Sequence, residues 1–264
     1  MYIILNGEAV PAAQAVMPYD SRGLRFGEGI FETMKVEDDQ VEFEQWHFER
    51  LQQGIGLLQL KGLPAMDLLA LHCRELVKMN GHVKARVRLT VSGGAGSLFD
   101  DPAAQYTIES WEMQPAKEAL GTCLFTGLPV EANMLSHIKH NNFLPYILAA
   151  KYAKQQGVDE CITVNGQGNI CEGTVSNIFL VKGNLLITPP LSEGCVGGII
   201  RRHIVEQTPP GFSVVQKPVT LPMLEDADEV FLTNSVYGIR PVARFHDRSF
   251  PITVIDSIKK ASGL

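Results

Sequence analysis

The pattern of hydrophobic and polar positions predicts strands in the first third of the chain. Residues 83–92 alternate strictly, with Val83, Ala85, Val87, Leu89 and Val91 on one face and Lys84, Arg86, Arg88, Thr90 and Ser92 on the other. Because successive side chains of a strand point to opposite faces, this alternation predicts a half-buried strand. Residues 2–5 and 29–36 are predicted to form two further strands.

Two helices are predicted between these strands. In residues 47–60, HFERLQQGIGLLQL, side chains recur at helical spacing at His47, Arg50, Leu51, Ile55 and Leu58. Such spacing places them on one helix face. Residues 66–79 form the second predicted helix, which ends at Asn80-Gly81 because these residue types commonly follow a helix C-terminus.

The second half of the chain has a different pattern, in which short strands alternate with turns. Strands are predicted at residues 123–130, 160–164, 169–181 and 185–189, with turns at 165–166 and 182–184. They are expected to form a meander. Helices are predicted within residues 135–157 and from Gly198 onward, and residues 226–242 are expected to supply a late strand and its exit loop.

A polar, proline-containing stretch separates the two patterns. It predicts a small N-terminal α/β domain at residues 1–112, a linker at 113–120 and a larger C-terminal α/β domain at 121–264. The predicted fold class is therefore mixed α/β with two domains and a cleft between them. A chain of 264 residues is long enough for this arrangement.

Composition and charge exclude several classes of protein. The net charge of −6 argues against a nucleic-acid-binding protein, which normally has a basic surplus. No apolar stretch approaches the length of a membrane span, and the N-terminal segment lacks the features of a secretory signal. The five cysteines form no CxxC pair, so free thiols in a reduced, cytoplasmic protein are expected.

One lysine stands out as a candidate for chemistry. Lys139 lies between His137 and His140 in the segment LSHIKHNN, directly before a predicted helix. Most such lysines are solvated surface charges, whereas a lysine held rigidly at this place can act as a nucleophile. No metal site is expected, because the two histidines have no third ligand at suitable spacing. The chain also lacks a P-loop, a G-x-S-x-G elbow and a complete G-x-G-x-x-G.

Several separated segments point to one family. They are RFGEGIFETMKV, HFERL, IKHNN, CEGTVSNIF, GGIIRR and TNS, in that order. Together they resemble the class IV pyridoxal-phosphate family, which contains branched-chain aminotransferases, D-amino-acid aminotransferases and aminodeoxychorismate lyases. The resemblance implies a fold-type IV enzyme that binds pyridoxal 5'-phosphate in the interdomain cleft, acts on a small molecule and forms a homodimer.

The resemblance also implies roles for individual residues. Lys139 would form the Schiff base with the cofactor aldehyde and then serve as the acid–base group. Glu172 would lie beside the pyridine nitrogen and keep it protonated. Without the other motifs, the favoured interpretation of Glu172 is a polar residue on an exposed strand face. Ser176 and Asn177 are expected to shape the bulge behind the cofactor.

The cofactor phosphate needs hydrogen-bond donors. The resemblance assigns this role to Arg50, to the backbone amides of Ile199 and Ile200 behind the glycines at 197–198, and to the hydroxyl of Ser235. A turn serine is the alternative interpretation of Ser235.

Only a few residues distinguish between the reactions found in this family. Phe31 and Leu144 stand where D-amino-acid and branched-chain aminotransferases, respectively, carry tyrosines, so an aminodeoxychorismate lyase is favoured. Some such lyases carry an arginine where this chain has Ala95. Substrate contacts are expected from Phe31, Arg86, Arg88 and Val236, with Arg240 as a further candidate for carboxylates. The alternatives are an aminotransferase for branched-chain or D-amino acids and a non-catalytic protein that binds the cofactor.

Overall fold

The computed structural model describes residues 1–264, which form two compact units. The first unit comprises Met1–Pro115 and Ile138–Asn142. The second unit comprises Ala116–His137 and Phe143–Leu264. No helix in either unit has the length and apolarity that crossing a membrane requires.

The segment around Lys139 belongs to the first unit, whereas the sequence-based domain bounds assign it to the C-terminal domain. The reason is backbone pairing with strand β3 (Gly29–Glu37). The Phe31 N–H donates to the Lys139 carbonyl oxygen at 2.8 Å, and the Asn141 N–H donates to the Gly29 carbonyl oxygen at 2.8 Å. These two hydrogen bonds attach the Lys139 segment to β3, although the two are distant in sequence.

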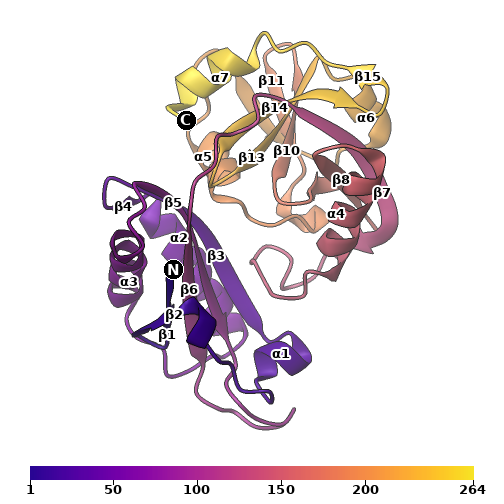
Figure 1. The fold of residues 1–264 in the computed structure, drawn as a ribbon. Coiled ribbons are helices and arrows are strands. Elements are labelled where there is room, and N and C mark those ends of the chain that lie inside the picture. The colour runs from indigo at the N-terminus through magenta and orange to yellow at the C-terminus, as the bar shows by residue number, and fades with distance from the viewer. The chain divides into compact units, whose positions relative to one another are not determined.

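The first unit contains a six-stranded sheet in the order β2-β1-β6-β5-β3-β4 (Figure 1). The other strands are β1 (Tyr2–Leu5), β2 (Glu8–Pro11), β4 (Gln40–Val41), β5 (Lys84–Ser92) and β6 (Gln105–Glu112). All neighbours are antiparallel. The predicted early strands are confirmed, except that Val83 lies before β5 and is 78% exposed.

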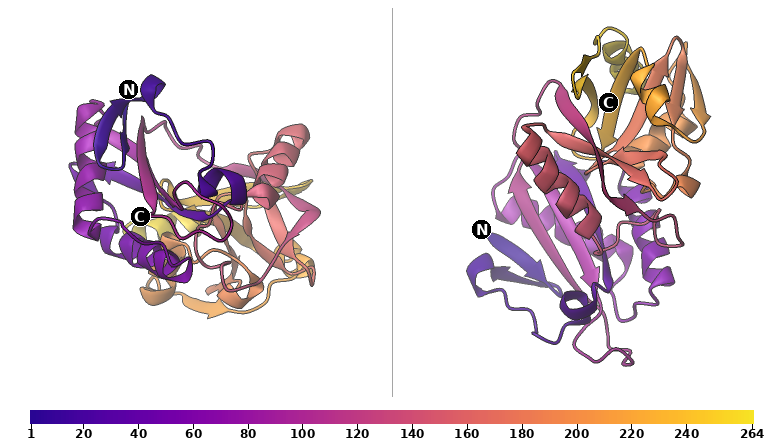
Figure 2. Two further views of the ribbon diagram at one scale, coloured as in Figure 1. Left: turned by 90° about the horizontal axis from the view of Figure 1, so that it is seen from below. Right: turned by 90° about the vertical axis from the view of Figure 1, so that its right-hand side faces the viewer.

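Helices α2 (Glu44–Leu57) and α3 (Met66–Met79) cover one face of this sheet (Figure 2). They bury the apolar side chains of β5, which confirms the alternation predicted for Ala85, Val87, Leu89 and Val91. Both predicted helices are confirmed. The 3-10 helix Ala12–Gln14 and the short helix α1 (Arg22–Phe26) complete the unit.

The second unit contains a nine-stranded sheet in the order β12-β11-β10-β13-β14-β7-β8-β9, with β15 on β14. Its strands are β7 (Leu120–Val130), β8 (Glu160–Asn165), β9 (Ile170–Gly173), β10 (Asn177–Lys182), β11 (Leu185–Thr188), β12 (Ser213–Gln216), β13 (Glu229–Asn234), β14 (Gly238–Phe245) and β15 (Arg248–Ser249).

The predicted meander is wrong in two places. Strands β7 and β8 are parallel, because helix α4 (Leu144–Gln156) returns the chain to the same end of the sheet. The single strand predicted at residues 169–181 is interrupted at residues 174–176 and forms two strands, β9 and β10, and β10 pairs with β11 and β13. The predicted exit loop is also wrong, since residues 238–245 form strand β14.

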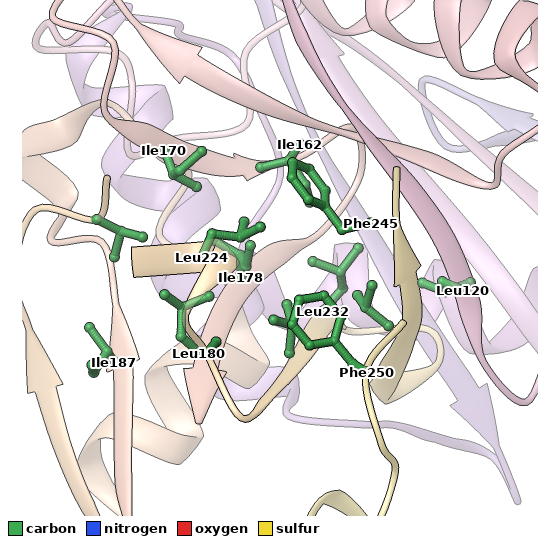
Figure 3. Close-up of a cluster of buried hydrophobic side chains, with 14 of the residues drawn as sticks. Leu120, Ile162, Ile170, Ile178, Leu180, Ile187, Leu224, Leu232, Phe245 and Phe250 are labelled. Atoms are coloured by element: carbon green, nitrogen blue, oxygen red, sulfur yellow. The ribbon is translucent and has the colours of Figure 1, made fainter. Parts of the chain in front are cut away.

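Aliphatic side chains from several of these strands form the core of the second unit, as Figure 3 shows for Ile162, Ile178, Leu180 and Leu232. The remaining helices are α5 (Ile199–Glu206), α6 (Leu221–Glu225), α7 (Ile255–Ser262) and the 3-10 helix Leu191–Glu193. All five cysteines of the chain are free and buried.

Candidate active site

Glycines of the first unit make room for the segment that carries Lys139. A Cβ atom on Gly29 would lie 2.3 Å from the Asn141 Nδ2 atom and 2.8 Å from the Val91 carbonyl oxygen. Gly27 has a φ of +70°, and a Cβ atom there would lie 2.3 Å from the Asn142 Oδ1 atom. Because real Cβ atoms do not approach so closely, the Gly-Glu-Gly motif and the two asparagines after Lys139 depend on each other.

Two cations share one aromatic ring beside this segment. The Lys139 Nζ atom lies 4.8 Å from the centroid of the buried Phe31 ring, and the Arg88 guanidinium carbon lies 3.7 Å from it. Burial lowers the pKa of Arg88, and its Nε donates to the Thr90 hydroxyl at 3.2 Å. Arg86 points to the same sheet face, where its guanidinium lies 4.6 Å from the Trp111 ring centroid. The structure therefore brings Phe31, Arg88 and Lys139 together.

Arg50 belongs to a buried ionic cluster between α2 and β3. Its Nε and Nη2 donate to the two carboxylate oxygens of Glu32 at 2.7 and 2.6 Å, and the His47 Nδ1 lies 2.6 Å from Glu32 Oε2. The side chain of Glu32 is 2% exposed and that of His47 is 0% exposed. A bidentate contact of this kind fixes the plane of the Arg50 guanidinium group.

The charge states in this cluster follow from burial and from the neighbouring charges. Burial by itself would raise the pKa of Glu32, but the charge of Arg50 and the hydrogen bonds from Arg50 and His47 lower it to about 2. Burial lowers the pKa of His47, and the charges of Arg50 and Lys139 act in the same direction. Since the ionised Glu32 only accepts, His47 donates from Nδ1 and its buried Nε2 atom, which has no hydrogen-bond partner, is an acceptor.

Glu172 of the second unit is 3% exposed, so it does not lie on an exposed strand face. The Tyr146 hydroxyl donates to Glu172 Oε1 at 2.5 Å. The Asn177 amide and the Val196 N–H donate to Glu172 Oε2 at 3.2 and 3.1 Å. Burial and the charge of Glu172 raise the pKa of Tyr146, so its hydroxyl keeps its proton and remains a donor.

Ile199 and Ile200 begin helix α5 behind two glycines. Gly198 is the N-cap residue and no side chain caps this helix, so the first-turn N–H groups lie at an end that attracts anions. A Cβ atom on Gly198 would lie 1.9 Å from the Asn177 Oδ1 atom. Glycine is therefore required for Asn177 to reach both Glu172 and the Val196 carbonyl oxygen, to which its amide donates at 2.8 Å.

Ser235 and Val236 lie in the turn between β13 and β14. The Asn234 Oδ1 atom accepts hydrogen bonds from the Val236 N–H at 3.1 Å and the Tyr237 N–H at 2.9 Å. Arg240 follows this turn, and its Nη2 atom donates to Glu160 Oε1 at 2.5 Å. This contact holds one nitrogen of the guanidinium group on a buried carboxylate, and the substrate role considered for Arg240 stays a prediction.

Three residues of these groups were not expected from the sequence. Glu32 occupies the inward parity of β3, between Ile30 and Met34, and a charge at such a position is a signal that a partner lies in the core. Tyr146 lies in the first turn of α4 with no sequence signal for its bond to Glu172. Glu160 likewise carries no signal beyond its place in an apolar strand.

Comparisons with known proteins agree with these observations. Residues 29–245 match the model of the family described as amino-transferase class IV. The chain is 31% identical to the "Putative branched-chain-amino-acid aminotransferase" of Methanocaldococcus jannaschii over 258 residues, which cover 94% of this chain and 89% of the relative. It is 29% identical to the aminodeoxychorismate lyase of Vibrio harveyi over 242 residues, 87% of this chain and 88% of that protein.

A solved structure extends this similarity to the fold. The branched-chain aminotransferase from Thermoproteus uzoniensis, crystallised with norvaline, matches with a TM-score of 0.88 and 25% identity, over 100% of this chain and 92% of that one. The fold class implied by the sequence motifs is confirmed. A family model that covers most of the chain leads to one conclusion: this protein is a member of the class IV aminotransferase family.

Proposed function

We propose that the protein is a lyase that converts 4-amino-4-deoxychorismate to 4-aminobenzoate and pyruvate. The observation that carries the proposal is the pair of cations on the Phe31 ring, Arg88 at 3.7 Å and Lys139 at 4.8 Å. A carboxylate near this ring would meet a guanidinium group beside the candidate reactive amine. The similarity to the Vibrio harveyi aminodeoxychorismate lyase gives further support.

The class IV family uses pyridoxal 5'-phosphate, and so does this chain. When bound, the cofactor supplies an aldehyde that reacts with amines and a ring that accepts electrons from a substrate carbon. Each unit contains groups that suit the cofactor. The donor set of the second unit includes the uncapped start of α5, which suits a phosphate, and the buried carboxylate of Glu172, which suits a protonated ring nitrogen.

Individual residues would then act as follows. In the first unit, Arg50 would donate to the cofactor phosphate, and in the second unit the donors would be Ser235 and the first backbone amides of α5. Glu172 would accept a hydrogen bond from a protonated ring nitrogen, and the bonds from Tyr146 and Asn177 fix the direction in which its carboxylate points. Lys139 removes a proton from the amine-bearing carbon of the substrate through its Nζ atom.

The substrate of the proposed reaction is a rigid dicarboxylate. Arg88 binds one carboxylate near Lys139, and Arg86, two residues earlier on the same sheet face, provides the second positive charge. Loss of the enolpyruvyl group then leaves an aromatic product. Such a site needs to grip two negative charges and does not need to accommodate varied side chains.

The second candidate is a class IV aminotransferase, which the 31% identity to the Methanocaldococcus protein favours. Tyr146 of this chain weakens the argument for the lyase that rests on Leu144. Leu144 lacks the hydroxyl found in branched-chain enzymes, but Tyr146, two residues later, places a hydroxyl on Glu172 at 2.5 Å. The choice between the two reactions therefore depends on Phe31 and on the arginines of β5.

The test is to incubate the cofactor-loaded protein with aminodeoxychorismate and no amino acceptor, and to measure 4-aminobenzoate. We expect product, and we expect Arg88→Ala to raise KM about tenfold or more while cofactor binding is retained. Arg74→Ala, on helix α3, is the matched control, since Arg74 pairs with Glu44 and not with the sheet face of Arg88. Efficient amino transfer from leucine or D-alanine to 2-oxoglutarate, with no 4-aminobenzoate, would overturn the lyase assignment.

A further inference from the structure

A buried ion pair in the second unit joins two strands that are not neighbours. Glu160 is on β8 and Arg240 is on β14, and β7 lies between these strands in the sheet. The Arg240 Nη2 atom donates to Glu160 Oε1 at 2.5 Å, and the two side chains are 12% and 5% exposed. A contact that reaches across an intervening strand requires both side chains to be extended toward each other.

The same pair contacts the turn that follows Glu172. The Ser176 hydroxyl donates to Glu160 Oε1 at 2.9 Å and accepts from Arg240 Nη2 at 3.2 Å. The Val175 N–H donates to the other oxygen of Glu160 at 3.3 Å. The carboxylate also packs against the backbone, since a Cβ atom on Gly173 would lie 2.7 Å from Glu160 Oε2.

The network continues into the turn that carries Ser235. The Asn234 amide donates to the Ser176 hydroxyl at 3.4 Å, while its Oδ1 atom accepts the N–H groups of Val236 and Tyr237. The Arg240 guanidinium lies 5.2 Å from the Tyr237 ring centroid. Each end of the turn between β13 and β14 is thus connected to the Glu160–Arg240 pair.

We propose that Glu160 and Arg240 are positioning residues that hold the Ser235 turn in a fixed place relative to Glu172. The inference rests on the proposed function in one respect, the role of Ser235 in phosphate binding. Removing two charges from water is costly, so a buried pair is a poor source of stability by itself. Burial raises the pKa of Glu160, although the charge of Arg240 and the hydrogen bonds to Glu160 act in the opposite direction. Burial of this carboxylate therefore opposes its ionisation.

Hydrogen exchange in the cofactor-free protein tests the positioning role without any assay of activity. In Glu160→Gln we expect the amides of residues 235–238 to exchange about tenfold faster or more, and those of β10 to be unchanged. Glu206→Gln is the matched control, because Glu206 forms an exposed pair with Arg202. If loss of one charge prevents folding, the paired variant Glu160→Gln/Arg240→Gln removes both charges and is measured in the same way.

A second measurement, the affinity of these proteins for pyridoxal 5'-phosphate, separates the two proposals. We expect the affinity to fall about tenfold in Glu160→Gln and not in the control. Faster exchange of the turn with unchanged affinity would support the positioning role but contradict the phosphate role of Ser235. Unchanged exchange, or acceleration that is uniform over β10 and the turn, would overturn the positioning role.

Discussion

The two units hold their candidate site residues by different physical means. In the first unit, Arg50 is fixed by full charges, because the Glu32 carboxylate binds both its guanidinium and the ring of His47. In the second unit, three hydrogen bonds to Glu172 come from donors with no net charge: a phenol, an amide side chain and a backbone N–H.

This difference matches the ligand groups proposed for each residue. Glu32 orients the Arg50 guanidinium through its Nε and Nη2 atoms, and a guanidinium held in one plane suits the oxygens of a phosphate. A ring nitrogen carries a single proton, and neutral donors orient Glu172 without cancelling the charge that retains this proton. The predictions below test this contrast, beginning with Lys139, the proposed reactive amine.

Replacing Lys139 should have the largest effect. Lys139→Arg should lower kcat/KM by about 10⁴-fold or more, because no other group is proposed to move the substrate proton. Borohydride treatment of the loaded protein, followed by peptide mass mapping, should locate the cofactor on Lys139. Lys151→Arg, on the exposed surface of α4, is the control. An adduct on another lysine would refute the assignment.

The buried cluster of the first unit should control stability in acid. Because the folded-state pKa of Glu32 is lowered from 4.5 to about 2, its stabilising effect is complete above pH 4.5 and is lost as the pH falls toward 2. Urea unfolding at several pH values measures this loss. Glu32→Ala should destabilise the protein by about 3–5 kcal/mol at neutral pH, since it leaves Arg50 buried without this carboxylate. Glu75→Gln, exposed on α3, should change neither quantity.

Arg50→Ala should act mainly on cofactor affinity. We expect a loss of roughly 2–4 kcal/mol in binding of pyridoxal 5'-phosphate, because the side chain is buried and its contact with phosphate is charge-assisted. Fluorescence titration of the cofactor-free protein gives the affinity. An affinity equal to that of the unmodified protein would exclude Arg50 from the phosphate site, and His82→Ala provides a comparison at a distant surface pair.

Glu172→Gln should have the smallest effect on binding and a selective effect on rate. The amide oxygen can still accept from Asn177 and Val196 while the amide nitrogen donates to the Tyr146 oxygen, so cofactor binding should persist, while kcat falls by about 10²-fold or more because the charge is lost. Glu193→Gln, another buried carboxylate of this unit, is the matched control. Unchanged turnover in Glu172→Gln would show that the carboxylate does not act on the ring nitrogen.

Periodicity predicted much of the secondary structure, and motifs predicted the family. The helix at residues 66–79 has the predicted bounds, because its apolar spacing and its Asn-Gly end are both local signals. The pairing of β10 with β13 was missed, since strand alternation indicates a buried face but not the neighbour across the ladder. The roles of Lys139, Arg50 and Glu172 stay predictions, which the experiments above address.

The sequence by itself determined which residue types the chain has available: one lysine between two histidines, an arginine on a helical face and a glutamate in a short strand. Only the tertiary structure decided how they are held. The Glu32–Arg50 contact joins residues 18 apart, and the Arg240–Glu160 contact joins residues 80 apart. Such partners meet when a helix packs on a sheet or when side chains reach past an intervening strand, and a hydrophobic pattern contains no information about which buried charges will then meet.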